Sequence, residues 1–205
     1  AHELMKIYFT RHGLTEYNKE RRIQGLLDSP LTLEGKEKAK ELGARLKDEG
    51  IEIIYSSDQK RAMDSAKIIN EALKLDIIPD RRLREVSMLS HEGMTWAESV
   101  ATDPDREDLI MQRPDLFNEG GIYPYRDALE DAIAFIFELI KTNYEKVLVM
   151  THGSKLRVIT TVLEGLDLKD TNKVELIKGL SLKIYDYNEG KFKLLHDDED
   201  YDNFV

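Results

Sequence analysis

The 205-residue sequence contains no cysteine. That absence excludes a disulfide framework, a thiolate metal site and a cysteine nucleophile. The sequence also lacks any run of about 18 apolar residues, the length that a membrane-spanning helix requires, and its start shows no signal-peptide pattern. We therefore expect a cytoplasmic protein without a membrane partner.

Basic residues are outnumbered by acidic ones. The sequence has 30 Lys and Arg against 40 Asp and Glu, a formal net charge of −10. This balance disfavours a surface that coats nucleic acid, so no nucleic-acid partner is expected, and a basic pocket would be a local arrangement. With 41% hydrophobic residues, the sequence is long enough for a sizeable core, and we expect one domain over residues 1–205.

Two apolar segments of the sequence end in the same way. Leu4–Thr10 and Val147–Thr151 are rich in apolar and β-branched side chains, as expected of buried strands. The first continues as Arg-His-Gly at 11–13 and the second as His-Gly at 152–153. Ligands of open α/β sheets bind at the carboxyl ends of strands. If the two strands are neighbours, both histidines therefore lie over one crevice.

The remaining periodicity defines the fold class. In chain order it predicts a helix over 32–49, a strand over 51–55, a helix over 59–73, a strand over 75–78 closed by Pro79, a helix from 127, a helix from 154 and an antiparallel hairpin over 181–196. This alternation predicts an α/β three-layer sandwich, whose mostly parallel central sheet has helices on both faces and an antiparallel edge. Residues 56–58 (Ser-Ser-Asp) are expected to cap the second helix.

Two parts of the chain lack this regularity. Over about 84–126 the periodicity fails, and we expect an insertion of short helices and loops that faces the substrate. The acidic tail from Asp197 is expected to be solvated or loosely packed.

The residues around the two histidines favour an anion as ligand. Arg11 adjoins His12, and Arg61 lies near the start of the second helix, whose N-terminus favours negative charge. Arginine suits phosphate oxygens, a neutral imidazole is a competent nucleophile near pH 7, and a second, cationic imidazole can stabilise a transferring phosphoryl group. Glu85, which follows the third strand, is placed to protonate a leaving alkoxide.

Each of these residues also has an ordinary interpretation. Glu85 alone is more often a solvated carboxylate, and Arg61 can simply cap a helix or form a salt bridge. A metal site is the main alternative for the histidine pair, but the sequence offers no third ligand at a suitable spacing. His2, His91 and His196 are expected to be surface residues or hydrogen-bonded core residues.

Five ordered segments resemble the signature of the histidine phosphatase superfamily, also called the phosphoglycerate-mutase-like family. They are Thr10–Asn18 (TRHGLTEYN), Arg22–Thr32 (RIQGLLDSPLT), Ser56–Ala62 (SSDQKRA), Leu83–Glu85 (LRE) and Thr151–Gly153 (THG). One Arg-His-Gly triplet is a weak signal, whereas five segments in the family's order are a strong one.

The resemblance implies catalytic roles. His12 would be the nucleophile that becomes a phosphohistidine. Arg11, Arg61 and His152 would clamp the phosphoryl group. Glu85 would be the general acid for the leaving group and then the base for water.

The resemblance also implies how substrate is bound. Asn18, Gln24 and Gly25 would lie in the outer part of the phosphate pocket. Neither a metal nor another cofactor is implied, since positioning and positive charge carry the transfer. The implied partner is a small phosphorylated substrate, and the protein would be a monomer or a homodimer.

Departures from the family pattern bear on the substrate. Mutases of the family follow the glutamate with Arg-His-Tyr-Gly, where this sequence has Val-Ser-Met-Leu at 86–89, and the chain is short for a mutase. It is more similar to the α-ribazole and broad-specificity phosphatases. Their Gly-x-Trp-Glu-Gly is replaced by Leu-Ser-His-Glu-Gly at 89–93, and their Gly-Glu-Ser by Gly-Gly-Ile-Tyr at 120–123.

We therefore expect a metal-independent phosphomonoester hydrolase. Two alternatives remain open on the sequence. One is a cofactor-dependent isomerase of the phosphoglycerate mutase type, and the other is a non-catalytic module that binds a phosphoanion or a protein.

Overall fold

The structure is a computed structural model that describes residues 4–202, so His2 and the end of the acidic tail, 203–205, lie outside it. Its strands are β1 (Leu4–Arg11), β2 (Ile53–Ser57), β3 (Ile77–Asp80), β4 (Lys146–Thr151), β5 (Leu182–Asn188) and β6 (Lys191–Asp197). They form one six-stranded sheet in the order β3-β2-β4-β1-β5-β6. The first four pair in parallel, and β5 and β6 continue the sheet antiparallel at one edge. The predicted mostly parallel sheet with an antiparallel edge is confirmed.

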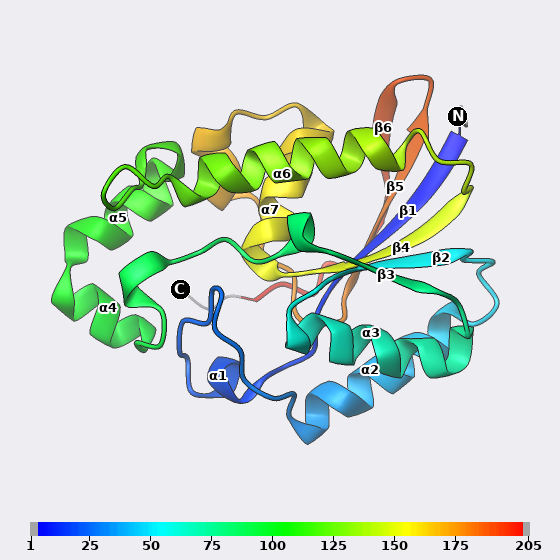
Figure 1. The fold of residues 1–205 in the computed structure, drawn as a ribbon, viewed down its shortest axis with the longest axis horizontal. Helices are drawn as coiled ribbons and strands as arrows, with labels where there is room; N and C mark the ends of the chain where they lie inside the picture. The colour runs from blue at the N-terminus through cyan, green and yellow to red at the C-terminus, as the bar shows by residue number, and fades with distance from the viewer. Residues whose placement is uncertain (1–3, 203–205) are drawn as a thin grey trace.

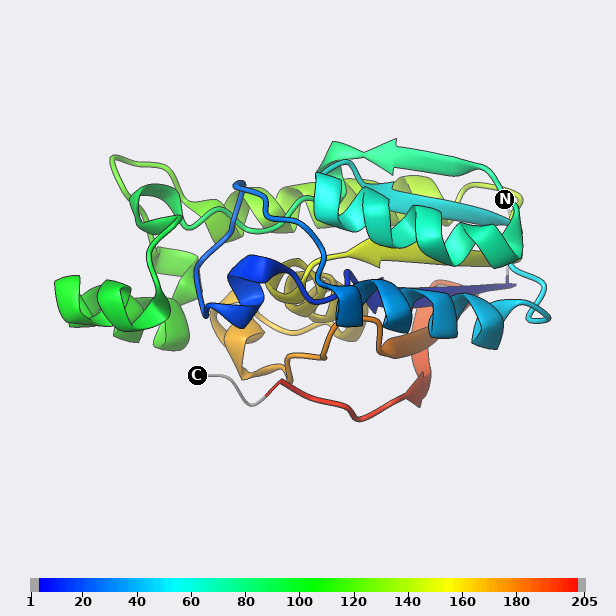
Figure 2. The same ribbon diagram turned by 90° about the horizontal axis from the view of Figure 1, so that it is seen from below.

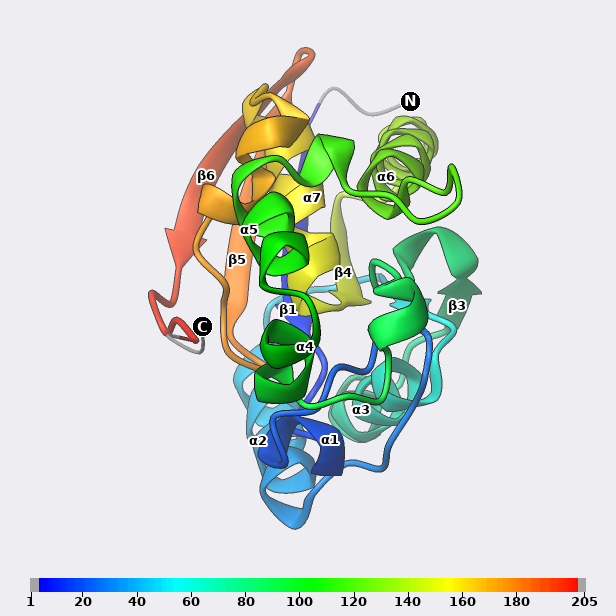
Figure 3. The same ribbon diagram turned by 90° about the vertical axis from the view of Figure 1, so that its left-hand side faces the viewer.

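Helices cover both faces of this sheet (Figure 3). One face carries α2 (Leu33–Leu46) and α3 (Lys60–Leu73), and the other carries α6 (Pro124–Leu139) and α7 (Gly153–Glu164). Side chains of a strand alternate between the two cores: in β4, Val147 and Val149 pack on the α6–α7 side, and Leu148 and Met150 on the α2–α3 side. A strand buried on both faces reads as a continuous apolar run. The predicted three-layer sandwich is confirmed.

The segment between β3 and α6 consists of short helices and loops, as predicted. It contains 3₁₀ helices at Arg81–Leu83, Leu89–His91 and Pro114–Leu116 and the helices α4 (Trp96–Thr102) and α5 (Pro104–Gln112). Figures 1 and 2 show α4 and α5 on the left, beyond the ends toward which the parallel strands run. The Ile23 amide donates to the Met94 carbonyl at 2.8 Å, which ties this insertion to the loop that follows the short helix α1 (Glu16–Lys19). The insertion thus adjoins the end of the sheet where the two histidines lie.

Two local predictions at the β2–β3 edge are wrong. Ser56 and Ser57 belong to β2, and the N-cap of α3 is Gln59, whose side chain makes no capping hydrogen bond. Strand β3 continues through Pro79 to Asp80 rather than closing before the proline. Because β3 is an edge strand, the missing N–H of the proline is tolerated there.

The acidic tail is solvated, as predicted, since none of residues 197–202 is buried, but specific hydrogen bonds hold it in place. The Asp198 carboxylate accepts two hydrogen bonds from the Arg45 guanidinium, at 2.9 and 2.7 Å. Further along, the Lys178 amide donates to the Asp200 carbonyl at 2.9 Å. The tail therefore runs along the segment that connects α7 to β5. Of the helices within residues 4–202, none is both long and apolar enough to span a membrane.

Candidate active site

Two neighbouring strands bring the two histidines together. β1 and β4 are parallel with Arg11 opposite Thr151, and the His12 amide donates to the Thr151 carbonyl at 3.1 Å. The His12 and His152 rings are 5.1 Å apart between centroids and meet edge to face. Both side chains are buried. The predicted meeting of His12 and His152 is confirmed.

His12 has a fixed pattern of hydrogen bonds. Its Nδ1 lies 2.7 Å from the Gly13 carbonyl, which can only accept, so Nδ1 carries the proton. The Arg61 Nε, which can only donate, lies 3.3 Å from His12 Nε2. Burial, and then the charges of Arg61 and Arg11, hold the His12 pKa well below its usual 6.5. His12 is thus a neutral imidazole with a lone pair on Nε2, as a nucleophile requires.

His152 has a different arrangement. Its Nε2 lies 2.7 Å from the Ser57 Oγ, and its Nδ1, although buried, has no hydrogen-bond partner within residues 4–202. Burial, and then the charges of Arg61 and other nearby groups, hold its pKa well below 6.5. The lowered pKa favours a neutral His152 in the free protein, where the ring stabilises an anion through an N–H. A cationic His152 beside a transferring phosphoryl group stays a prediction.

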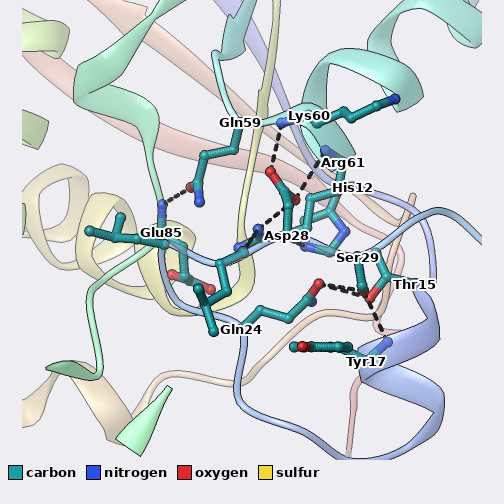
Figure 4. A network of polar contacts seen from close by, with 12 residues as sticks. His12, Thr15, Tyr17, Gln24, Asp28, Ser29, Gln59, Lys60, Arg61 and Glu85 are labelled. Atoms are coloured by element: carbon teal, nitrogen blue, oxygen red, sulfur yellow. Dashed lines mark hydrogen bonds and ion pairs between the residues drawn. The ribbon is translucent and has the colours of Figure 1, made fainter. Parts of the chain in front are cut away.

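Arg61 is buried at the start of α3, close to His12 (Figure 4). Its guanidinium donates to the Leu27 carbonyl at 2.6 Å, the Gly25 carbonyl at 2.8 Å and the Asp28 carboxylate at 2.8 Å. Asp28 also accepts from the amide of Lys60 at 2.9 Å and from that of Arg61 at 3.3 Å. The prediction that this helix terminus favours negative charge agrees with the structure, where the carboxylate of Asp28 occupies it.

Arg11, the residue before His12, is held by distant parts of the chain. Its Nη1 donates to the Ile177 carbonyl at 2.8 Å and lies 3.4 Å from the Asp202 carboxylate. A Cβ at Gly153 would come within 3.1 Å of this guanidinium. The glycine after His152 therefore gives Arg11 the room to lie beside α7.

Glu85 is fixed at the N-terminus of α7. Its carboxylate accepts hydrogen bonds from the amides of Lys155 at 2.9 Å, Ser154 at 3.2 Å and Val86 at 2.8 Å. Its own amide donates to the Gln59 Oε1 at 2.8 Å (Figure 4). The prediction of a carboxylate near the histidine pair agrees with this placement, because α7 begins directly after His152.

Gln59 is a residue that the sequence did not single out. Its amide nitrogen donates to the Gly25 carbonyl at 2.9 Å, while its oxygen holds Glu85. Gln59 thereby connects two parts of the site. One is the loop at Gly25, which also binds Arg61, and the other is the backbone of Glu85. Its place directly before α3, near Arg61, was the one signal available in the sequence.

The predicted outer residues shape the loop after β1. The Asn18 Oδ1 accepts from the Thr15 amide at 3.1 Å and closes the capping box of α1. The Gln24 Oε1 accepts from the hydroxyls of Thr15 at 3.1 Å and Ser29 at 2.9 Å (Figure 4). Gly25 has a left-handed φ of +54°, which favours glycine. A contact of Asn18, Gln24 or Gly25 with substrate stays a prediction.

The other histidines of the described chain lie apart from the pair. His91 is buried with its Nδ1 2.7 Å from the Ser99 Oγ, and His196 bonds Asp198 at 2.6 Å. These contacts agree with the ordinary roles expected for them. Among the described residues, no cluster of three or more His, Asp and Glu is arranged to hold a metal ion.

The sequence is similar to known proteins over nearly its whole length. A sequence model of the histidine phosphatase superfamily (branch 1) matches residues 7–199. An Escherichia fergusonii protein named "Probable phosphoglycerate mutase GpmB" is 30% identical over 199 residues, which cover 92% of this chain and 88% of that protein.

Solved structures match the fold over nearly the whole chain. Bacillus stearothermophilus YhfR is 31% identical with a TM-score of 0.88, and the match covers 97% of this chain and 98% of that one. The alpha-ribazole phosphatase of Shigella flexneri has a TM-score of 0.85 at 19% identity, covering 95% of this chain and 96% of that one, which is a likeness of fold. The expected phosphoglycerate-mutase-like fold is confirmed.

Proposed function

The chain belongs to the histidine phosphatase superfamily, and from that membership we propose that it is a metal-independent phosphomonoester hydrolase working through a phosphohistidine. Its substrate would be a small phosphorylated metabolite. The observation that carries the proposal is the ring of His12, whose Nδ1 donates to the Gly13 carbonyl and whose Nε2 lies 3.3 Å from the Arg61 Nε, with the His152 ring 5.1 Å away.

The first step transfers the phosphoryl group to the protein. The lone pair of His12 Nε2 attacks phosphorus, and the bond from phosphorus to the leaving oxygen breaks. Glu85, as the general acid, gives a proton to that oxygen. Arg11 and Arg61, with an N–H of His152, stabilise the charge on the equatorial phosphoryl oxygens.

The second step returns the protein to its starting state. Water attacks the phosphorus of the phosphohistidine, and the bond to His12 Nε2 breaks. Glu85, now ionised, takes the proton of the attacking water and is again the acid. Inorganic phosphate leaves, so the sum of both steps is the hydrolysis of a phosphomonoester.

Hydrolysis is favoured over isomerisation by the residues after Glu85. Val-Ser-Met-Leu at 86–89 stands where mutases of the family have Arg-His-Tyr-Gly. The second candidate is a phosphoglycerate mutase, because the relative from Escherichia fergusonii carries that name at 30% identity. A mutase needs to keep the phosphoryl group from water, whereas a phosphatase delivers it to water.

The test is phosphate release from a panel of monoesters with EDTA present. The panel contains p-nitrophenyl phosphate, 3-phosphoglycerate and sugar bisphosphates, with the His12→Ala variant as the blank. We expect release from several substrates despite the chelator. No release, together with interconversion of 2- and 3-phosphoglycerate after priming with a bisphosphate, would instead establish the mutase.

A further inference from the structure

The hydrogen-bonding state of His152 is set by one residue of β2. Ser57 is the last residue of that strand and is fully buried, and its Oγ lies 2.7 Å from His152 Nε2. The other ring nitrogen, Nδ1, has no partner within residues 4–202. A buried nitrogen without a partner is costly, which points to a ligand that supplies the missing bond.

A neutral histidine carries its proton on only one ring nitrogen, and its partner decides which. The Ser57 Oγ already accepts from the Gln59 amide at 3.3 Å. Among the described residues, the hydrogen bonds of this hydroxyl are those with the Gln59 amide and with His152 Nε2, so its single hydrogen is left for His152 Nε2. When Ser57 donates to Nε2, the ring proton sits on Nδ1, and the unpartnered atom becomes a donor. The opposite tautomer would point a lone pair at any anion that binds there.

We propose that Ser57 is a positioning residue that holds His152 in the Nδ1–H tautomer, so that Nδ1 donates to an oxygen of the bound phosphoryl group. The inference rests on the proposed function for the identity of that anion. It adds to the role of His152, which would act in the reaction as a neutral hydrogen-bond donor. Its tautomer would be set by Ser57, a residue of another strand. Ser57 touches the histidine and acts through it.

The chain offers a matched control in the preceding residue. Ser56 is also fully buried in β2, but its hydroxyl donates to the Ser57 carbonyl at 2.9 Å rather than to a histidine. Ser56→Ala and Ser57→Ala each remove one buried hydroxyl from the same strand. A difference between them in the state of His152 cannot come from the loss of a buried hydroxyl as such.

The first arm of the test is ¹⁵N NMR of the histidine rings in the free protein near pH 7, with His152 identified by its loss in His152→Gln. We expect the Nδ1–H tautomer in the wild type and in Ser56→Ala, and a mixed or opposite tautomer in Ser57→Ala. An Nε2–H tautomer in the wild type, or an unchanged one in Ser57→Ala, would overturn the inference. This arm does not depend on any substrate.

The second arm is turnover of p-nitrophenyl phosphate. Ser57→Ala is expected to lower kcat/KM roughly 10- to 100-fold, the size of effect seen when the hydrogen-bond partner of a metal-ligating histidine is removed. Ser57→Thr keeps the hydroxyl and is expected to recover most of the activity. Equal losses in Ser56→Ala and Ser57→Ala would overturn the positioning role. A wild type with the expected tautomer but no phosphatase activity would instead contradict the proposed function.

Discussion

The carboxyl ends of β1 and β4 carry the same His-Gly pair and present opposite chemistry. At the end of β1, His12 meets a carbonyl and a guanidinium, whose roles as acceptor and donor are fixed, and this leaves a lone pair on Nε2. At the end of β4, His152 meets a serine hydroxyl, which can give or accept, and its Nδ1 is without a partner in the described chain. The contacts of each ring, rather than the shared motif, therefore separate an acceptor from a donor.

The largest loss of activity is expected when His12, the ring with the free lone pair in this comparison, is removed. His12→Ala leaves no nucleophile, so turnover should fall by at least about a thousandfold. Losses of this size or larger are seen when the nucleophile is removed from a set of catalytic residues that act together. The measurement is kcat/KM with p-nitrophenyl phosphate, with the fold checked by circular dichroism. His196→Ala, at an exposed histidine, is the matched control. Activity within tenfold of the wild type would rule out His12 as the nucleophile.

The next largest loss of activity is expected at Glu85, which would supply the proton for the leaving oxygen. Glu85→Gln keeps the shape but cannot donate, so hydrolysis of alkyl phosphates should fall by about 10²–10⁴, the usual contribution of a general acid. Formation of the phosphohistidine from an aryl phosphate should fall far less, since p-nitrophenolate leaves without a proton. Burst kinetics on both substrate types measure this. Glu92→Gln is the control, because that carboxylate likewise accepts from backbone amides. Equal losses in the burst for alkyl and aryl leaving groups would contradict the acid role.

Both histidines are expected to be neutral in the folded protein, and the dependence of its stability on pH tests this. The pKa of each is lowered on folding, by burial first, so the unfolded chain binds more protons than the folded one below pH 6.5. Stability should be complete above about pH 6.5 and should fall on acidification, by at most about 1.4 kcal/mol per pH unit for each histidine.

Urea unfolding between about pH 7.5 and 5.5 measures this slope, in a window where carboxylates contribute little. His12→Asn and His152→Asn should each reduce it, and His196→Asn should not. A wild-type slope that both variants leave unchanged would mean that the two rings titrate normally in the folded protein.

The smallest change, a lower KM, is expected when the ion pair of Arg11, the last residue of β1, is removed. The Asp202 carboxylate, 3.4 Å from this guanidinium and partly exposed, would compete with a phosphoryl group for it. Asp202→Asn should lower KM by less than about fivefold, the size of a weak exposed ion pair, and leave kcat unchanged. Steady-state kinetics with Asp200→Asn as control check this. A tenfold fall in kcat would instead make Asp202 part of the catalytic machinery.

The sequence predicted the sheet and the histidine pair because both depend on local patterns. Leu4–Thr10 and Val147–Thr151 are continuous apolar runs, which only buried strands of a covered sheet require. Parallel neighbours then place the residues that follow each strand at one edge. Arg11 and Glu85 came from the same reasoning, since each adjoins the end of a predicted strand.

The contacts that tune the pair were not predictable, because they join residues far apart in the chain. Asp28 binds the start of α3 from 33 positions away, and Asp202 reaches Arg11 over 191 positions. Ser57 shows the limit of propensity most clearly. Serine before a helix is a common cap, yet in this fold the strand extends through Ser57, and its hydroxyl meets His152 as well as the Gln59 amide.

The most direct test of the central claim is to locate the phosphoryl group on the protein. Glu85→Gln would be mixed with p-nitrophenyl phosphate and quenched in alkali, where phosphohistidine survives. Peptide mass spectrometry and ³¹P NMR would then identify the modified residue and ring nitrogen. The account predicts a phosphoryl group on Nε2 of His12. A group on Nδ1 or on His152, or continued turnover without any covalent phosphoryl, would contradict it.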